Sequence, residues 1–288
     1  MRRFCRFYRA HREYFYDWCA IGSIYGAPSD CLWAGGRVEY SDRTPREVLA
    51  LTREYGISAR LTLSNSLLRP EHLTDPDCNA LCRLFQEQND PQNGAIVHAE
   101  LLTQYLKKNY PSLYLVSSTT KVLTDFNDLQ RELARPEFRY VVPDFRLNRA
   151  FDRLAALPQS QKDKVEFLCN ECCWFGARNA EPAMSRQPQK SGSARPGALL
   201  QRPRRSGRVS LLPGDGEPRL YRHQAIRDTY LPRASPNSRS RGALGSALIL
   251  EFLLHYLTKP EYQLAVREEL YLDTMLGPFL TDFVVRAG

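Results

Sequence analysis

The chain has 288 residues, of which 43% are hydrophobic and 25% are charged, and its formal net charge is +8. This composition is ordinary for a soluble protein, and no apolar run reaches the ~20 residues that a membrane-spanning helix needs. The basic N-terminus carries no apolar segment of the kind found in secretory signals, so we expect a cytoplasmic protein with no membrane partner.

The positive charge is confined to one segment. Residues 178–242 contain 14 Lys and Arg but only 4 Asp and Glu, whereas the rest of the chain contains 26 and 28. Residues 177–221 are rich in Arg, Pro, Ser and Gly and show neither a helical nor a strand period, which predicts disorder. Because the basicity belongs to this segment and not to a folded surface, nucleic acid is an unfavoured partner.

Six short β-prone runs, each followed by a helical segment, make up the first part of the chain. We expect strands at residues 21–25, 58–63, 95–97, 113–116, 140–142 and 165–168. Helices are expected from Pro45 to Tyr55, with Thr44 and Glu47 as a capping box, and over residues 70–88, 101–106, 125–133 and 147–157. Helices at 243–257 and 260–276 are expected near the C-terminus.

Regular alternation of strands and helices is typical of parallel βαβ units. Polar residues follow nearly every strand, and in parallel α/β folds this end of the strands holds the chemistry. The sequence therefore predicts an α/β fold of the TIM-barrel type. An eight-fold barrel needs two further units after Ala177, and no pattern for them is visible, so we expect the barrel to be incomplete or disrupted after the sixth strand.

The residues at the predicted strand ends are the candidates for a ligand site. Glu171 and Asp144 are candidates for general acid or base, and Arg37 and Lys121 for binding an anion. The full set expected to bind ligand is Tyr25, Arg37, Asn65, Ser117, Lys121, Asn148 and Asn170. Alternative interpretations stay open: residues 32–37 can be a plain glycine turn, and the hydroxyls at 117–120 can cap a helix. His98 is interpreted as structural.

The eight cysteines do not indicate a disulfide framework, because no secretory signal accompanies them. Cys78 and Cys82 are interpreted as buried helix positions. Cys169, Cys172 and Cys173 lie together at the end of the sixth predicted strand, and Cys172 and Cys173 are the candidate metal ligands. Adjacent cysteines rarely bind one metal together, so we do not expect this chain to complete a cluster site.

The run Asn170-Glu171-Cys172-Cys173 after an apolar strand resembles the Asn-x-x-Cys strand end of the collagenase-like bacterial peptidases of family U-32. Further similar motifs are Ile24-Tyr25-Gly26, Gly35-Gly36-Arg37, Ser117-Ser118-Thr119-Thr120-Lys121, Val141-Val142-Pro143-Asp144 with Asn148, and Lys259-Pro260-Glu261-Tyr262. The resemblance implies a TIM-type barrel and, in several relatives, a [4Fe–4S] cluster held by cysteines. It covers about residues 16–175 and 226–276.

Residues 177–242 depart from that family pattern. One choice of codons for residues 177–185, read one base earlier, encodes Cys-Pro-Glu-Arg-Arg-Thr-Cys-Tyr-Glu, and a similar shift at residues 234–241 gives a run containing Phe-Lys-Ile-Glu-Gly. Both runs match the family. We therefore expect that parts of this segment are translated out of the ancestral frame, and we divide the chain into a barrel part (1–176), this segment (177–242) and C-terminal helices (243–288).

Three functions are weighed on this basis. The first is a peptidase-like barrel that binds a small or peptide-like ligand at its strand ends, without identifiable catalytic residues for proteolysis. The second is an iron–sulfur protein of the same family. The third is a basic module that binds RNA or acidic partners through residues 177–242.

Overall fold

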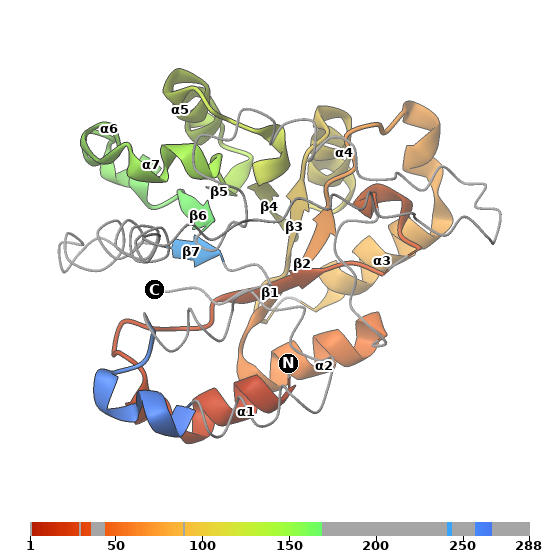
Figure 1. Ribbon diagram of the computed structural model, residues 1–288. Coiled ribbons are helices and arrows are strands. Elements are labelled where there is room, and N and C mark those ends of the chain that lie inside the picture. The colour runs from red at the N-terminus through yellow and green to blue at the C-terminus, as the bar shows by residue number, and fades with distance from the viewer. Residues whose placement is uncertain are drawn as a thin grey trace, which may run out of the picture.

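The structure is a computed structural model that describes residues 2–28, 30–35, 44–88, 90–168, 241–243 and 257–266 (Figure 1). Predicted features in residues 36–43, 169–240, 244–256 and 267–288 lie outside the described residues. Within the described ranges, no helix has the length and apolar character needed to cross a membrane.

Five strands form one parallel sheet, in the order in which they occur along the chain. They are β1 (Ser23–Gly26), β2 (Ser58–Leu63), β3 (Gly94–Val97), β4 (Tyr114–Ser117) and β5 (Phe138–Val141). Every neighbouring pair is parallel. Parallel neighbours require a crossover connection, and each connection here contains helix. The predicted α/β class with parallel strands is therefore confirmed.

A sixth strand, β6 (Glu166–Leu168), lies beside β5. A parallel bridge joins Val141 to Val165, and the Val141 N–H donates to the Lys164 carbonyl at 2.8 Å. On its other side, β6 pairs in parallel with β7 (Arg241–Ala243). The series of parallel strands therefore continues beyond the five-stranded sheet.

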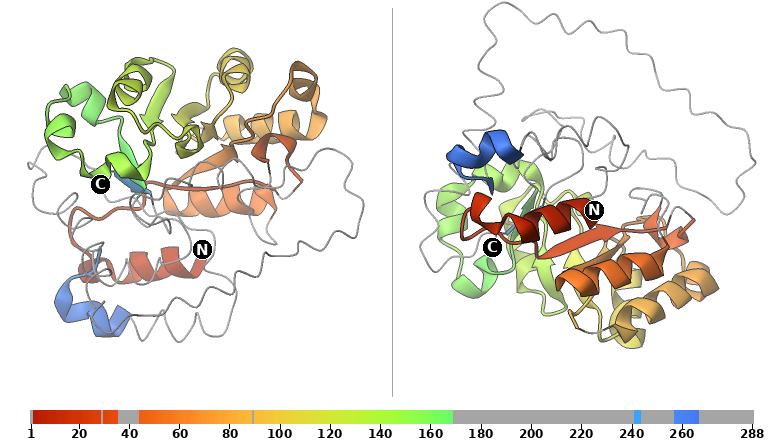
Figure 2. Two further views of the ribbon diagram at one scale, coloured as in Figure 1. Left: turned by 45° about the horizontal axis from the view of Figure 1, so that its top comes forward. Right: turned by 90° about the horizontal axis from the view of Figure 1, so that it is seen from below.

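Helices lie between the strands in the sequence and outside them in space. The α-helices are α1 (Arg2–Ala10), α2 (Pro45–Tyr55), α3 (Pro76–Glu87), α4 (Glu100–Asn109), α5 (Phe126–Ala134), α6 (Phe151–Ala155) and α7 (Gln159–Lys162). Short 3-10 helices are η1 (Arg12–Tyr14), η2 (Leu32–Ala34), η3 (Pro70–Thr74), η4 (Thr119–Lys121), η5 (Phe145–Arg149) and η8 (Pro260–Tyr262). Figure 2 shows α3, α4 and α5 following one another along one side of the strands.

The boundaries of α2 follow from its caps. The Glu47 N–H donates to the Thr44 hydroxyl, and the Thr44 N–H donates to the Glu47 carboxylate at 2.8 Å, which satisfies two backbone donors of the first turn. Gly56 ends the helix in the left-handed conformation, with φ of 64°. The predicted helix from Pro45 to Tyr55 is confirmed at both ends.

Two predicted helices are each interrupted in the structure. The prediction of one helix over 70–88 is wrong because Pro76 lacks an N–H and holds Asp75 in a non-helical conformation, so η3 ends and α3 begins there. The segment predicted as a helix over 147–157 begins instead as η5, which the Asp144 side chain caps, and continues as α6 after Ala150. Helix α1 was not predicted.

The helix-facing side of the sheet forms the main core. Leu61 and Leu63 of β2 and Val97 of β3 are fully buried there, and they belong to one cluster with Leu102 and Leu106 of α4. Because side chains alternate along a strand, the residues between them point to the opposite face of the sheet.

That opposite face, called here the interior face, contains a buried charged cluster. Arg60 of β2 is fully buried, and its Nη1 atom lies 2.9 Å from Oε1 of Glu166 on β6. Its Nε atom donates to the Tyr114 hydroxyl at 2.8 Å. The guanidinium also lies over the Tyr114 and Tyr140 rings, 5.3 and 5.1 Å from their centroids.

The Arg60–Glu166 pair shows that the sheet is curved. Three strands, β3 to β5, separate β2 from β6, and in a flat sheet four strand spacings would place the two strands about 19 Å apart. An arginine and a glutamate side chain joined by an ion pair are shorter than that. The strands must therefore curl so that the interior face is concave and β6 comes opposite β2.

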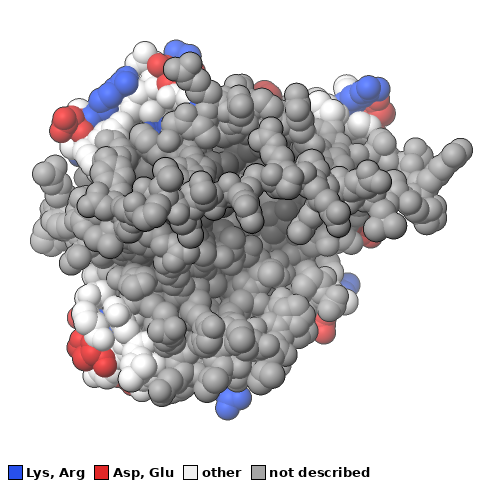
Figure 3. Space-filling view, viewed as in Figure 1, with Lys and Arg blue, Asp and Glu red and all other residues white. Residues whose placement is uncertain are grey.

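Charged side chains of both signs lie next to one another on the described surface. In the view of Figure 3, the described Lys and Arg residues lie around the edge of the molecule, beside Asp and Glu. Arg135 illustrates this mixing, with Glu100 at 2.8 Å and Glu137 at 2.7 Å.

The Tyr114 ring reaches Arg60 because Gly94 of β3, the strand between them, leaves room for it. A Cβ atom on Gly94 would lie 2.6 Å from a Tyr114 ring carbon. We expect the Gly94→Ala variant to lose about 1–3 kcal/mol of unfolding free energy, because it overpacks this contact. Urea unfolding measured by circular dichroism checks this.

The Tyr114→Ala background is the control for that prediction. With the ring removed, the added methyl group has space, and alanine is favoured over glycine in a strand by about 0.5–1 kcal/mol. Gly94→Ala should then be neutral or stabilising. An equal cost in both backgrounds would show that the Tyr114 contact is not the cause.

Candidate functional site

The carboxyl ends of β2, β3 and β4 bring three polar side chains together. On the interior face, the alternation that gives Arg60 and Thr62 on β2 continues to Ser64 just beyond the strand. In the same way, Ile96 of β3 is followed two positions later by His98, and Val116 of β4 is followed two positions later by Ser118. Parallel strands end at one edge of a sheet, so these three side chains lie at a common edge.

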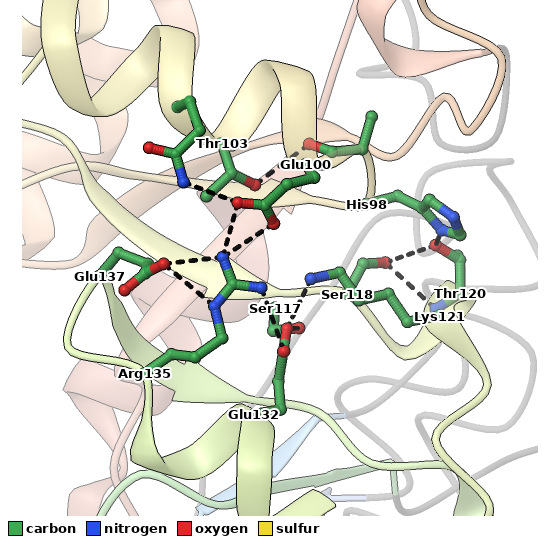
Figure 4. A network of polar contacts seen from close by, with 12 residues as sticks. His98, Glu100, Thr103, Ser117, Ser118, Thr120, Lys121, Glu132, Arg135 and Glu137 are labelled. Carbon is green, nitrogen blue, oxygen red and sulfur yellow. Dashed lines mark hydrogen bonds and ion pairs between the residues drawn. The ribbon is translucent and has the colours of Figure 1, made fainter. Parts of the chain in front are cut away.

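A continuous chain of hydrogen bonds joins these side chains. The Ser64 and Ser118 hydroxyls are 3.1 Å apart, and the Thr120 hydroxyl donates to Ser118 Oγ at 3.0 Å. The Thr120 hydroxyl also lies 2.7 Å from His98 Nδ1 (Figure 4). Ser64 and Ser118 are buried, whereas His98 and Thr120 are half-buried. The end of the chain at His98 and Thr120 is thus the part open to solvent or to a ligand.

Counting protons gives this hydroxyl–imidazole chain a direction. Ser118 Oγ accepts from both the N–H and the hydroxyl of Thr120, so its own proton is directed to Ser64. Since the single hydroxyl proton of Thr120 goes to Ser118, His98 must donate from Nδ1. If His98 instead accepts at Nδ1, every hydroxyl in the chain reverses. The three strand ends are therefore linked by one chain of donors and acceptors.

Ser117 and Lys121, two of the predicted ligand-binding residues, meet on Glu132 of α5. The Ser117 hydroxyl donates to Glu132 Oε1 at 2.6 Å, and Lys121 Nζ donates to the same atom at 2.5 Å (Figure 4). Burial raises the pKa of Glu132, but the hydrogen bonds from Lys121 and Ser117 outweigh it and lower the pKa. Ser117 thus faces the helices, and this ion pair holds the turn that carries Thr120.

Asp144, a candidate acid or base, lies close to the same turn. The Asp144 N–H donates to the Leu123 carbonyl, and the Thr119 hydroxyl donates to the Pro143 carbonyl, both at 3.3 Å. The Asp144 side chain is 1% exposed and accepts from Arg146 Nε at 2.7 Å. Its carboxylate is therefore held in an ion pair at the end of β5.

The remaining described candidates lie around this edge. Asn65 donates to the Leu32 carbonyl at 2.9 Å and accepts from the Leu67 N–H, so it fixes the loop after β1. Tyr25 is half-buried on β1, opposite Arg60 in the register, and thus belongs to the interior face. Asn148 is half-buried in η5. The five other candidates, Arg37, Asn170, Glu171, Cys172 and Cys173, lie outside the described residues.

No family model matches the chain, and no curated protein matches it. The solved structure of the U32 peptidase Mk0906 is similar to it, with 14% sequence identity over 58% of this chain and 75% of that chain. The TM-score is 0.38. This likeness is distant, at a level that assigns neither a family nor an activity.

The cysteines expected to hold the cluster that the resemblance implies, Cys169, Cys172 and Cys173, lie outside the described residues. A [4Fe–4S] cluster needs four thiolates, and the described cysteines are Cys5, Cys19, Cys31, Cys78 and Cys82. Among the described residues, no group of three or more His, Cys, Asp or Glu side chains could hold a metal ion. Cys172 and Cys173 remain a prediction.

Sequence reasoning missed Ser64, His98 and Ser118 as members of the site. Each immediately follows a strand of the structure, although the strand before Ser118 was predicted to end one residue early, and each stands two positions after a residue of the interior face. That signal was available in the sequence. His98 was interpreted as structural because a lone histidine between a strand and a helix has no partner in sequence; its partner, Thr120, is 22 positions away.

The lowered pKa of Glu132 predicts a loss of stability in acid. A carboxyl whose pKa is lower in the folded than in the unfolded state stabilises the fold fully above the unfolded value, about 4.3, and ceases to do so as the pH falls through the folded value. We expect urea unfolding between about pH 7 and about pH 3 to show a smaller acid loss in Glu132→Gln than in the wild type.

The exposed Glu71 provides a matched substitution. Its side chain is 62% exposed, so Glu71→Gln should keep the acid loss of the wild type. If Glu132→Gln and Glu71→Gln show the same pH dependence, Glu132 is not held by Lys121 and Ser117 as described.

Proposed function

We propose that this chain is a TIM-type barrel protein, similar to the U32 peptidases and disrupted after its sixth strand, that binds a small polar or peptide-like ligand at its strand ends. Two features support the barrel: the strands follow one another in parallel, and the Arg60–Glu166 pair brings β6 opposite β2. Both are expected when a parallel sheet curls towards closure.

The observation that carries the ligand site is the hydroxyl–imidazole chain from Ser64 through Ser118 and Thr120 to His98. Hydroxyl and imidazole groups carry both donors and acceptors, so a chain of them can take up a polar group of a ligand. Thr120 and His98 are the half-buried end. An amide group of a ligand offers both donors and an acceptor, and so suits either direction of the chain, whereas a carboxylate only accepts.

In this proposal, each residue of the chain has a separate role. His98 donates or accepts a hydrogen bond at the end of the chain, because either nitrogen of a neutral imidazole can carry the proton. Thr120 contacts the ligand. Ser118, itself bonded to Ser64, holds Thr120 in position, and the two serine hydroxyls determine which way the hydrogen bonds of the chain point. Proteolysis is not part of the proposal, which assigns no hydroxyl or thiol of the described strand ends as a nucleophile for it.

Other expectations stay predictions beside this proposal. They include the ligand-binding roles of Tyr25, Asn65 and Asp144. They also include the roles of the five candidates that lie outside the described residues, which are Arg37, Asn170, Glu171, Cys172 and Cys173. The three-part division of the chain and its cytoplasmic location are predictions as well. The nucleotide sequence across codons 170–245 tests the change of reading frame directly.

Peptide binding to matched valine variants tests the proposal. We would screen a library of short peptides against the full chain by thermal shift and measure the affinity of the best binder by calorimetry. Thr120→Val removes the hydroxyl at constant shape and breaks the chain of hydrogen bonds. We expect it to weaken binding about tenfold or more, the equivalent of about 1.4 kcal/mol for one lost buried hydrogen bond and its unpaired partner.

Thr119→Val is the matched control, because its hydroxyl donates only to the Pro143 carbonyl at the long distance of 3.3 Å. It should bind like the wild type. His98→Ala should weaken binding as Thr120→Val does. Equal affinity of wild type and Thr120→Val would contradict the site, and failure of the wild type to bind any peptide would contradict the ligand class.

A further inference from the structure

Two cysteines from distant parts of the chain lie in direct contact. The sulfurs of Cys31 and Cys78 are 3.6 Å apart, and both residues are buried, with exposed fractions of 8% and 2%. Cys31 directly precedes η2 in the loop after β1, and Cys78 is the third residue of α3. They are 47 positions apart in sequence, so the fold and not the chain brings them together.

The contact affects the acidity of the two sulfurs in opposite directions. The hydrogen bond from Cys78 lowers the pKa of Cys31, and the backbone N–H groups of Ala34 and Trp33 lower it further. The same hydrogen bond raises the pKa of Cys78. Of the two, Cys31 is therefore the sulfur on which the thiolate form is favoured. A thiolate is the reactive form of cysteine.

Two other buried cysteines provide the contrast. Burial raises the pKa of Cys5 to about 11 and that of Cys19 to about 12. Neither makes a thiol–thiol contact within the described part of the chain. Such cysteines are inert packing residues, and the Cys31–Cys78 pair differs from them by its geometry.

We propose that Cys31 and Cys78 are a redox-active dithiol that a hydroperoxide converts into a reversible disulfide. The Cys31 thiolate attacks the peroxide oxygen, which breaks the O–O bond, releases an alcohol or water and leaves a sulfenic acid on Cys31. The Cys78 sulfur then attacks that sulfur, forms the S–S bond and releases water. Two thiols are oxidised and one hydroperoxide is reduced.

The place of this dithiol gives its oxidation a consequence for the fold. Asn65, at the end of β2, binds the carbonyl of Leu32 with its side chain and that of Trp33 with its backbone N–H. The disulfide would tie this same loop to the first turn of α3. Oxidation would thus fix the loop that borders the strand ends, separately from the hydroxyl–imidazole chain.

Disulfide mapping after mild oxidation tests the inference on the full chain. The reduced protein is treated with one equivalent of hydrogen peroxide, blocked with N-ethylmaleimide, digested without reductant and analysed by mass spectrometry. We expect a linked peptide pair containing Cys31 and Cys78, two hydrogens lighter than the separate peptides, that dithiothreitol separates. A higher midpoint of thermal unfolding should accompany it.

Variants separate the roles of the two sulfurs. In Cys78→Ser, the sulfenic acid on Cys31 has no partner and should be trapped by dimedone, whereas Cys31→Ser should show no trapped Cys78. Cys19→Ser is the control and should form the disulfide like the wild type. Should a variant fail to fold, the wild type still decides, because Cys31 should be oxidised about tenfold or more faster than Cys19 at neutral pH.

Two outcomes overturn the proposal. One is a disulfide that maps to another pair, such as Cys31 with Cys82, the buried thiol one turn beyond Cys78 on α3. The other is oxidation of Cys31 at the same rate as Cys19, without any linked peptide pair.

Discussion

The buried ion pair between Arg60 and Glu166 is the interaction on which the rest of the described structure depends. Each charge would be costly to bury by itself, because neither is hydrated inside the fold. Together they compensate each other's charge, since both Glu166 oxygens accept from Arg60 Nη1, at 2.9 and 3.0 Å. The pair requires β2 and β6 to face each other, and so it requires the sheet to be curved.

Neighbouring residues are fitted around this pair. The Tyr114 hydroxyl accepts from Arg60 Nε and contacts the Ser58 hydroxyl at 2.7 Å, and Gly94 provides the space for its ring. Further along the same strands, the same alternation of side chains places Ser64, His98 and Ser118 at the carboxyl ends. The hydroxyl–imidazole chain therefore lies on the same concave face as the ion pair, just beyond the carboxyl ends of β2, β3 and β4.

Local features of the sequence predicted most of the elements, because short-range physics determines them. The capping box of Thr44 and Glu47 and the stop at Gly56 are local signals, and the strand over Ser58–Leu63 was predicted to the residue. Pro76 was a local signal too, and the helix predicted over 70–88 overlooked it.

Long-range partners could not be predicted: 106 positions separate Arg60 from Glu166, and 47 separate Cys31 from Cys78. A charge inside an apolar strand indicates a buried partner, but not which residue it is. For the same reason the sequence indicated polar strand ends correctly, yet it did not show that Ser117 turns to Glu132 while Ser118 turns to Ser64.

The central claim is that Arg60 and Glu166 are paired across the concave face, and a double-mutant cycle on the free energy of unfolding tests it most directly. Arg60→Met and Glu166→Gln should each cost about 3–5 kcal/mol, because each leaves its partner buried and unpaired. The double variant should cost less than the sum of the two by more than 1 kcal/mol, whereas the exposed pair of Arg69 and Glu71, treated in the same way, should show near-additive effects of about 0–1 kcal/mol. Additive effects at Arg60 and Glu166, within about 0.5 kcal/mol, would contradict the pairing and the curved sheet inferred from it.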